Sequence, residues 1–433
     1  MFVPNFPAHV QRSLAAVGTT PNLRTPEARL QEAIGLAKAI GLNIIEASNV
    51  PVRTIRPSTL FGKGKVEELG KLIEDQEIGL AIIDHAITPV QQQSLEEAWN
   101  CKVLDRTGLI LEIFGERAQT KEGRLQVELA HLNYQKSRLV RAWTHLERQR
   151  GGLGFVGGPG ETQIEADRRM IQLRVNNLEK DLEKVRRTRL LHRAKRKKIP
   201  HPVVALVGYT NAGKSTLFNM LTGAGVVAKD LLFATLDPTM RQLNLPGGTK
   251  VILSDTVGFI SNLPTHLVAA FRATLEEVVE ADLILHVRDI ADPDTAAQAK
   301  DVMTIMGQLG LDDGESQDRI MEIWNKIDLL DPESLEAIRA TRTDLDQPNS
   351  PILISAVTGE GTDRLLENIE LQIAGSDSAI EILLDITQLA QIPWVYENAS
   401  VITRDDLEDG SVRLEIRASS NVREKLSRFI VKA

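Results

Sequence analysis

The stretch Gly208-Tyr209-Thr210-Asn211-Ala212-Gly213-Lys214-Ser215-Thr216 decides the fold of this chain. It fits the pattern G-x-x-x-x-G-K-[ST], which is the phosphate-binding P-loop. The β-branched run 203–207 before it predicts a buried strand, and residues 215–221 after it predict the opening of a helix. A strand, a glycine-rich turn and a helix point successive backbone N–H groups at one phosphate. The alternative is a chance match in a glycine-rich turn, and the later motifs argue against it.

Four further motifs follow the P-loop along the chain. They are Phe233-Ala234-Thr235-Leu236-Asp237-Pro238-Thr239, Asp255-Thr256-Val257-Gly258, Asn325-Lys326-Ile327-Asp328 and Ser355-Ala356-Val357. The last three come directly after the apolar runs 250–254, 320–324 and 351–354, which predict strands. Ligands of open α/β sheets bind at the carboxyl ends of strands. We therefore expect all of these motifs to line one nucleotide, GTP or GDP, in a P-loop GTPase domain of the translation-factor class.

Hydroxyl and carboxylate side chains of these motifs predict a Mg²⁺ site. Asp255 stands where a Walker-B aspartate holds Mg²⁺ through water, and the Ser215 hydroxyl is placed to ligate the ion. Thr235 can close on Mg²⁺ and on the γ-phosphate, which the Gly258 N–H can also sense, so loss of that phosphate would release both loops. We assign the metal to Ser215, Thr235 and Asp255 (through water), and catalysis to Lys214, Thr235, Gly258 and Asn211.

The motif Asn325-Lys326-Ile327-Asp328 is expected to select the base. The Asp328 carboxylate can accept two hydrogen bonds from guanine N1–H and the 2-amino group, a donor pair that adenine lacks. The Lys326 stem would pack over the base plane. Backbone N–H groups of Ser355 and Ala356 can donate to guanine O6.

The position after Gly258 is informative because of what it lacks. In Ras-like enzymes a glutamine there orients the attacking water, whereas this chain has Phe259. A phenyl ring cannot hold water by hydrogen bonding, so we expect slow intrinsic hydrolysis that needs a partner, another residue or a monovalent cation. Several GTPases that K⁺ activates carry an asparagine at the position of Asn211, and K⁺ dependence is therefore a hypothesis.

Length and composition indicate a globular protein of several domains. The chain has 433 residues, enough for about two to four domains. Its one cysteine, Cys101, cannot form an internal disulfide. No apolar run approaches the roughly 20 residues of a membrane span, and the first residues lack a secretory signal pattern. We expect a cytoplasmic monomer, with no indication of peripheral membrane association.

Strands alternate with helices in the first part of the chain. Residues 1–25 are aperiodic and predict a poorly ordered start. Helices are then predicted over 27–39, 66–75 and 89–99, and strands over 43–53, 80–84 and 102–105. This alternation predicts a parallel α/β domain over residues 26–120.

Residues 121–200 have the pattern of a long helical hairpin. Two amphipathic stretches, 121–147 and 164–194, flank the glycine-rich segment 151–160, which is longer than a helix connection requires. The segment is open to three interpretations: a flexible turn, a probe that enters a partner with Phe155, or a cradle for a second phosphate.

A basic run closes the second of these stretches. Eight positive charges lie between Arg186 and Lys198 without an intervening acid, although the whole chain has a net charge of −8. A solvated helix face is one interpretation. A polyanionic partner is the other, because a local basic patch matters more for phosphate contacts than the charge of the whole chain.

The nucleotide motifs define a GTPase domain over residues 201–375, and a small α+β domain is predicted over 376–433. In the latter, 379–386, 400–403 and 412–416 predict strands, and 388–398 and 421–431 predict helices. We assign this domain no chemistry. The fold class is therefore a multidomain α/β protein with a helical hairpin between its N-terminal and GTPase domains.

The ordered motifs and the segment after the glycine-rich loop resemble the HflX family of ribosome-associated GTPases. That segment is Glu161-Thr162-Gln163-Ile164-Glu165-Ala166-Asp167-Arg168-Arg169. The stretches 233–239 and 255–259 are similar to the switch regions of this family, including the hydrophobic residue at position 259. The resemblance runs from near Pro26 to near Leu371.

This resemblance implies a partner and an activity. Proteins of the HflX type bind the 50S ribosomal subunit in the GTP state, can dissociate stalled or stress-damaged 70S ribosomes, and leave on hydrolysis. Carried onto this chain, contacts to rRNA and ribosomal proteins fall on Gly154, Phe155, Gly157, Gly158, Arg168, Arg169, Arg193, Lys195, Arg196 and Lys197.

Two other functions remain open from the residues. One is a GTP-dependent regulatory switch that acts on a protein partner. The other is an RNA-remodelling enzyme driven by ATP at the N-terminal domain. The resemblance implies an ATPase activity for that domain, although no P-loop sequence lies in it.

Overall fold

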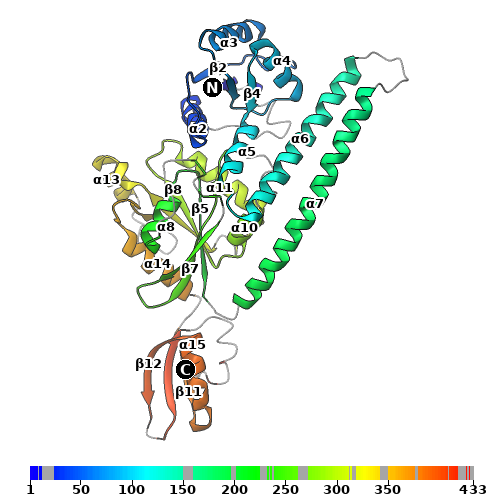
Figure 1. Cartoon of the computed structure of the whole chain (residues 1–433). Coiled ribbons are helices and arrows are strands. Elements are labelled where there is room, and N and C mark those ends of the chain that lie inside the picture. The colour runs from blue at the N-terminus through cyan, green and yellow to red at the C-terminus, as the bar shows by residue number, and fades with distance from the viewer. Residues whose placement is uncertain are drawn as a thin grey trace.

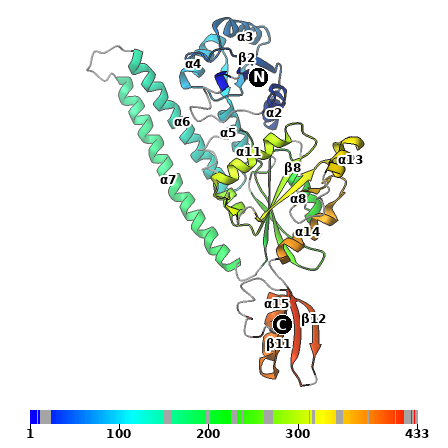
Figure 2. The same cartoon turned by 180° about the vertical axis from the view of Figure 1, so that it is seen from behind.

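The chain forms an N-terminal domain, a helical hairpin, a GTPase domain and a C-terminal domain (Figure 1). The computed structural model describes residues 1–7, 9–11, 24–149, 159–196, 201–224, 232–233, 235–236, 238–261, 272–311, 313–314, 318–341, 350–375, 379–407, 409–417, 426 and 429. The hairpin runs alongside the N-terminal and GTPase domains, and the C-terminal domain lies at the end of the molecule opposite the N-terminal domain (Figures 1 and 2).

The N-terminal domain is the predicted parallel α/β unit. Its strands are β1 (Phe2–Asn5), β2 (Ser48–Pro51), β3 (Leu80–Ile83) and β4 (Lys102–Asp105), and its helices are α2 (Pro26–Ala39), α3 (Lys63–Asp75), α4 (Pro89–Trp99) and α5 (Arg106–Arg117). The strands are ordered β2-β1-β3-β4, and every pair is parallel. A proline follows the cap residue Thr88 of α4, which forms a capping box with Gln91.

The start of the chain corrects a prediction. Residues 1–25 were expected to be poorly ordered, but Phe2–Asn5 form β1, which lies inside the sheet between β2 and β3. Phe2 and Val3 are buried, and the Phe2 ring packs edge-on against Trp99 with ring centroids 5.7 Å apart. A strand of four residues is too short for its pattern to be recognised, and its partner strands lie far along the chain.

Two elements next to it also differ from the prediction. The strand expected over 43–53 is confined to Ser48–Pro51. Helix α5 was not expected at all; it begins directly after β4 because Asp105 Oδ1 accepts a hydrogen bond from the Gly108 N–H at 2.8 Å and caps it. Most residues of α5 are buried, so they lack the polar face by which amphipathic helices are recognised.

Helices α6 (Lys121–Gln149) and α7 (Pro159–Arg196) form the hairpin. They pack against each other, and Arg174 of α7 donates to Glu128 of α6 at 2.7 Å. In the part of the chain that the structure describes, no helix is both long enough and apolar enough to cross a membrane. The tip, residues 150–158, lies outside the described residues, so its three interpretations stay open.

The GTPase domain is built on a mixed six-stranded sheet of order β10-β9-β8-β5-β7-β6. Among the described strands of this sheet, only β6 pairs antiparallel with its neighbour. The strands are β5 (Val203–Gly208), β6 (Thr239–Asn244), β7 (Lys250–Asp255), β8 (Leu283–Asp289), β9 (Ile320–Asn325) and β10 (Ile352–Leu353), and the described helical elements are α8 (Lys214–Thr222), α10 (Arg272–Val279), α11 (Thr295–Gln308), η1 (Ile327–Leu329), α13 (Pro332–Thr341) and α14 (Thr362–Gly375). Strand β6 was not predicted.

One apolar core crosses the boundary between the N-terminal and GTPase domains. Ile110 and Phe114 of α5 belong to the same buried cluster as Phe233 and Ile260 of the GTPase domain. The Phe114 and Phe233 rings meet edge to face with centroids 4.7 Å apart. The N-terminal domain therefore packs against segments that the sequence assigns to the nucleotide switches.

The C-terminal domain is a small antiparallel sheet with helical turns, as expected. Its described elements are β11 (Ala379–Leu384), η2 (Ile386–Gln391), α15 (Ile392–Asn398), β12 (Ser400–Asp406) and β13 (Val412–Arg417), with strand order β11-β13-β12. The helix predicted over 388–398 is divided where Pro393 opens α15. The closing helix predicted over 421–431 falls almost wholly outside the described residues.

Candidate nucleotide-binding site

The P-loop connects β5 to α8, and two of its glycines are required by close approach. A Cβ at Gly208 would lie 2.1 Å from Val287 O, and a Cβ at Gly213 would lie 2.2 Å from Asn325 Nδ2. Gly213 also caps α8 with φ of 91°, in the left-handed region that favours glycine. The loop is therefore held tightly against β8 and Asn325 at the positive end of a helix.

Lys214 is buried and folded back onto the loop. Its Nζ donates to Tyr209 O at 2.8 Å and to Gly208 O at 3.1 Å. Burial lowers the Lys214 pKa to about 8, although the Asp255 carboxylate opposes this shift. A desolvated ammonium gains from an anion placed beside it, which suits the predicted contact with phosphate.

The three residues assigned to Mg²⁺ meet at one point. Asp255 Oδ2 accepts hydrogen bonds from Ser215 Oγ at 2.7 Å and from Thr235 Oγ1 at 2.8 Å, and the two hydroxyls are 2.9 Å apart. Among the described residues, Asp255 Oδ1 has no hydrogen-bond donor, and burial raises the pKa of this carboxyl. All of these potential ligands are oxygen atoms, which Mg²⁺ prefers, so these residues fit the ion.

Gly258 lies beside the Lys214 ammonium. A Cβ at Gly258 would be 3.1 Å from Lys214 Nζ and 3.0 Å from Thr210 Cα. The next residue pairs with the P-loop, because Phe259 N donates to Gly208 O at 3.1 Å and Thr210 N donates to Phe259 O at 2.7 Å. The Phe259 side chain is 1% exposed and belongs to the apolar core, so it cannot orient a water molecule.

Asn325 joins the P-loop to the loop that follows β10. Its Nδ2 donates to Ala212 O at 2.9 Å, and its Oδ1 accepts from the Ala356 N–H at 3.0 Å. Asn325 is 1% exposed. The sequence assigned it to the nucleotide, and in the structure it is a brace between the P-loop and the loop after β10.

Of the next two polar residues of this motif, Lys326 is half-buried and Asp328 is exposed. Lys326 has a φ of 67°, and its Nζ donates to Asp289 Oδ2 at 2.6 Å. Asp328 lies in the turn η1 and is exposed. An exposed carboxylate beside the P-loop brace is available to a guanine edge.

The two N–H groups predicted to donate to guanine O6 have partners within the protein. Ser355 N donates to Glu360 O at 2.9 Å, and Ala356 N donates to Asn325 Oδ1 at 3.0 Å. Both N–H groups are thus engaged within the protein, and donation to a base requires an exchange of partners. The following residue, Val357, is exposed.

Several residues predicted to contact the nucleotide have buried side chains. The side chains of Phe233, Leu236, Val257 and Ile327 are buried and apolar, and Tyr209 is buried with its hydroxyl bonded to Glu32. The buried Thr256 hydroxyl donates to Leu206 O at 2.5 Å. Thr216 lies half-buried in the first turn of α8.

Other predicted residues lie where less can be said. Outside the described residues are Gly154, Phe155, Gly157, Gly158, Lys197, Ala234 and Asp237. Arg193, Lys195 and Arg196 lie on the last turns of α7. Arg168 and Arg169 are exposed near its start, where Arg169 pairs weakly with Glu165 at 3.9 Å.

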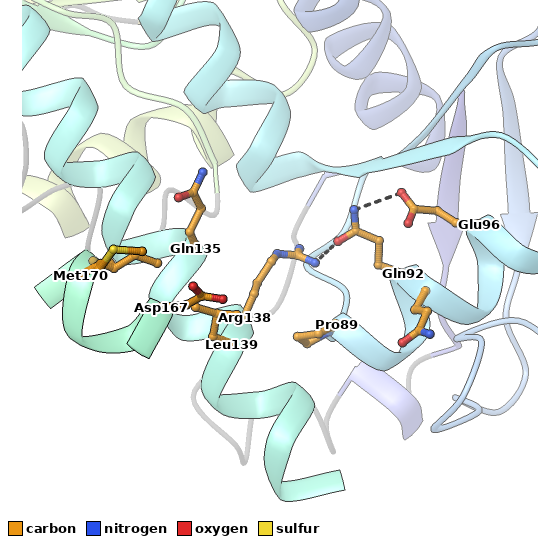
Figure 3. Close-up of a pocket in the computed structure, with 10 residues that line it drawn as sticks. Pro89, Gln92, Glu96, Gln135, Arg138, Leu139, Asp167 and Met170 are labelled. Carbon is orange, nitrogen blue, oxygen red and sulfur yellow. Dashed lines mark hydrogen bonds between the residues drawn. The ribbon is translucent and has the colours of Figure 1, made fainter. Parts of the chain in front are cut away.

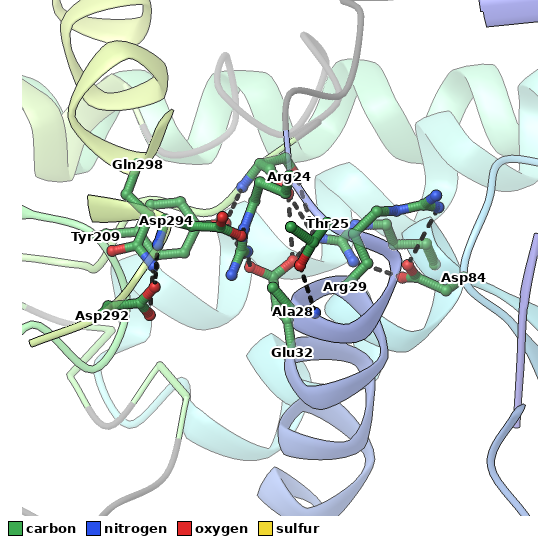
Figure 4. A network of polar contacts seen from close by, with 12 residues as sticks. Arg24, Thr25, Ala28, Arg29, Glu32, Asp84, Tyr209, Asp292, Asp294 and Gln298 are labelled. Carbon is green, nitrogen blue, oxygen red and sulfur yellow. Dashed lines mark hydrogen bonds and ion pairs between the residues drawn. The ribbon is translucent and has the colours of Figure 1, made fainter. Parts of the chain in front are cut away.

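A buried polar network beside the P-loop was not predicted (Figure 4). Glu32 of α2 accepts hydrogen bonds from Arg24, from the Tyr209 hydroxyl and, at 2.6 Å, from Arg106. Arg24 also bonds Asp294 at 3.2 Å. These residue types are usually solvent-exposed, and they come from distant parts of the sequence, so no local pattern signals the network.

A separate cavity of about 610 Å³ lies where the hairpin meets the N-terminal domain (Figure 3). Its walls come from α4, α6 and α7 and include Gln92, Arg138 and Met170. Arg138 bonds Gln92 and, at 2.6 Å, Asp105. No GTPase-domain residue lines this cavity among those described, so it is distinct from the nucleotide site.

The P-loop, the oxygen cluster at Asp255 and the Asn325 brace lie at the carboxyl ends of β5, β7 and β9. This arrangement, on a mixed sheet that is parallel except at one edge, defines a P-loop GTPase. Comparisons with known proteins specify the family.

Four family models together cover most of the chain. They are described as GTP-binding GTPase N-terminal (residues 27–115), GTP-binding GTPase Middle Region (117–196), 50S ribosome-binding GTPase (203–326) and HflX C-terminal domain (342–432). The last of these extends the resemblance beyond residue 371, into the domain to which we assigned no chemistry.

Full-length relatives agree with these models. GTPase HflX of Magnetococcus marinus is 49% identical over 380 residues, covering 88% of this chain and 86% of the relative. GTPase HflX of Escherichia coli is 41% identical over 390 residues, covering 90% and 89%. A putative GTP-binding protein 6 of Xenopus laevis is 33% identical, covering 95% and 77%. The chain belongs to the HflX family and is a GTPase.

Solved structures show a more distant likeness. A GTP-binding protein of Sulfolobus solfataricus in complex with GDP matches with a TM-score of 0.43 and 23% identity, covering 87% of this chain and 99% of that chain.

Proposed function

We propose that this GTPase binds the 50S ribosomal subunit in its GTP state, promotes dissociation or rescue of stalled or stress-damaged 70S ribosomes, and leaves on hydrolysis. The proposal is carried by the match of its GTPase domain to a family described as 50S ribosome-binding GTPases. The basic run 186–198 supports it, because clustered lysines and arginines bind RNA phosphates by releasing counterions.

The bonds at Asp255 support a nucleotide switch. We infer that the Ser215 and Thr235 hydroxyls hold Mg²⁺ directly and that Asp255 holds it through water; when bound, the ion neutralises charge on the phosphates. Thr235 already bonds Ser215 and Asp255, so this residue is held at the site. Gly258 lies beside Lys214, where its N–H can bond a γ-phosphate. Loss of that phosphate removes a partner from both segments, which would lower the affinity for the ribosome.

Co-sedimentation with purified 50S subunits tests this proposal. The chain is mixed with subunits in the presence of a non-hydrolysable GTP analogue, GDP or no nucleotide. Strong binding with the analogue alone is the expected result, and subunit dissociation of 70S ribosomes is then measured by light scattering. Absence of binding in all three states would contradict the proposal and favour a switch acting on a protein partner.

The RNA contact is tested by neutralising Arg193, Lys195, Arg196 and Lys197 to alanine. If these residues bind rRNA phosphates, 50S binding weakens and its dependence on salt concentration becomes flatter. The matched control removes the same charge from exposed lysines of the N-terminal domain, Lys38, Lys63, Lys71 and Lys102. Equal binding and an equal salt slope for both variants would rule out the basic run as the RNA contact.

A further inference from the structure

Glu32, in the N-terminal domain, contacts two functional segments of the GTPase domain. Its Oε1 accepts from Ser261 Oγ at 3.2 Å and from Arg106 at 2.6 Å. Its Oε2 accepts from Arg24 and from the Tyr209 hydroxyl of the P-loop. Burial would raise the Glu32 pKa, but the two arginines outweigh it and the pKa is lowered. A buried carboxylate that stays charged thus joins the domains (Figure 4).

The Tyr209 hydroxyl extends this contact to the segment after Gly258. It donates to Glu32 and accepts from Ser261 N at 2.8 Å and from Arg24 at 3.0 Å. A phenol has one donor and two acceptor sites, so every hydrogen-bonding site of this hydroxyl is occupied. The hydroxyl of a P-loop residue therefore holds the backbone of the switch segment.

Ser261 is fixed through every polar group that it has. Besides its N–H and hydroxyl bonds, its carbonyl accepts from Arg106 at 3.1 Å. Two residues earlier, both the N–H and the carbonyl of Phe259 bond the P-loop backbone. Gly258, which is expected to bond the γ-phosphate, therefore sits beside Lys214 in a segment that is anchored at its carboxyl end by the N-terminal domain.

The N-terminal domain also touches the other switch. A Cβ at Gly35 of α2 would lie 3.1 Å from Leu232 Cδ1, and Phe114 of α5 packs against Phe233 with ring centroids 4.7 Å apart. Leu232 and Phe233 precede Thr235, the residue closed on the metal site. Contacts from one domain thus reach both segments that respond to the γ-phosphate.

We propose that Glu32 is a positioning residue for GTP hydrolysis. It acts through Tyr209 and Ser261 to hold Gly258 against the P-loop, so that the placement of the N-terminal domain sets recognition of the γ-phosphate. The groups that contact the α- and β-phosphates lie on the P-loop backbone and α8, outside this network. The proposal concerns the GTPase reaction itself and is independent of ribosome binding.

Two variants isolate this function. Glu32→Gln keeps the size of the side chain but removes its charge, and Tyr209→Phe removes one hydroxyl. We expect each to weaken binding of a fluorescent non-hydrolysable GTP analogue about tenfold and to lower kcat by a similar factor, since hydrogen bonds to charged groups contribute about this much. Binding of fluorescent GDP should stay within about twofold of wild type, because GDP has no γ-phosphate for Gly258 to bond.

A matched control separates positioning from stability. Asp105 is another buried carboxylate bonded to an arginine and a tyrosine, Arg138 at 2.6 Å and Tyr134 at 2.7 Å. Both of these partners lie in helix α6 of the hairpin, away from the GTPase domain. Asp105→Asn should lower the melting temperature as much as Glu32→Gln does but leave the ratio of the analogue and GDP dissociation constants unchanged.

The double variant and the null results complete the test. If Glu32 acts through Tyr209, then Glu32→Gln combined with Tyr209→Phe should be no worse than the stronger single variant. Folded single variants with a wild-type affinity ratio and a wild-type kcat would overturn the proposal. A similar change in the ratio of the analogue and GDP dissociation constants in Asp105→Asn would also overturn it, because the effect would then be one of general stability. If Glu32→Gln does not fold, Tyr209→Phe alone decides the question, since it retains the charge pairs.

Discussion

Replacement of Asn325 by alanine tests the brace most directly. In the structure Asn325 donates to Ala212 O at 2.9 Å and accepts from the Ala356 N–H at 3.0 Å. Ala212 and Ala356 are both buried. The variant would remove both bonds at once and leave a carbonyl and an N–H without partners in places that water reaches poorly.

The size of the effect follows from these two groups. A buried polar group that loses its partner costs about 1–3 kcal/mol. At about 1.5 kcal/mol each, the two groups sum to about 3 kcal/mol, which corresponds to a rise of about 100-fold in Kd if nucleotide binding must restore the two loops. Because the brace is independent of the γ-phosphate, GDP and a GTP analogue should be affected alike.

Titration with fluorescent GDP and GTP analogue measures this effect, and thermal unfolding reports on stability. Asn368→Ala is the matched control, since its Nδ2 makes one exposed bond to Arg364 O at 2.8 Å on α14, and surface changes of this kind usually stay within about 0.5 kcal/mol. A GDP affinity for Asn325→Ala within about threefold of wild type would refute the reasoning.

Three further predictions concern the same site. Lys214 has a pKa of about 8 because burial disfavours its charge. Phosphate binding requires the ammonium, so GDP affinity should fall about tenfold between pH 7 and pH 9. In the same titration, the Lys214→Arg variant, which stays charged, should not show this pH dependence. Turnover should be faster in KCl than in NaCl, and Asn211→Ala should abolish the difference; equal wild-type rates in the two salts would remove the K⁺ hypothesis. Asp328→Ala should weaken GTP binding by about 10- to 100-fold without strengthening ATP binding, as competition experiments can show; unchanged discrimination would assign base selection to another residue.

Much of the fold was predictable because local sequence patterns indicate its strands and helices. The alternation of strands and helices before residue 106 predicted the parallel N-terminal sheet, and the helix over 89–99 matches α4 in full. The elements that were missed have weak local signals. Strand β1 is very short, and α5 is buried on most sides, so both are recognisable only by what they contact.

In the nucleotide site, too, local motifs predicted some features and tertiary contacts decided others. Ser215, Thr235 and Asp255 were predicted to meet at Mg²⁺, and the structure brings their oxygen atoms within 3 Å of one another. The sequence did not indicate that the Ser355 N–H bonds Glu360 O in the same loop or that the Ala356 N–H bonds the Asn325 side chain of another loop. Hydrogen-bond competition of this kind is a property of the packed chain and not of a motif.

By itself, the sequence determined the chemistry of this protein: a phosphate loop, a set of hard oxygen ligands and a carboxylate suited to guanine, each placed after a strand. Short-range spacing suffices for this, since a strand, a turn and a helix bring neighbouring residues together wherever the motif occurs. Only the tertiary structure decided which part of the molecule holds the switches. Glu32, Arg106, Tyr209 and Ser261 meet because two domains share one buried boundary. Contacts between residues so far apart in the sequence depend on how whole domains pack. A charged group can be buried at such a boundary only because its hydrogen-bonding and charged partners are buried beside it.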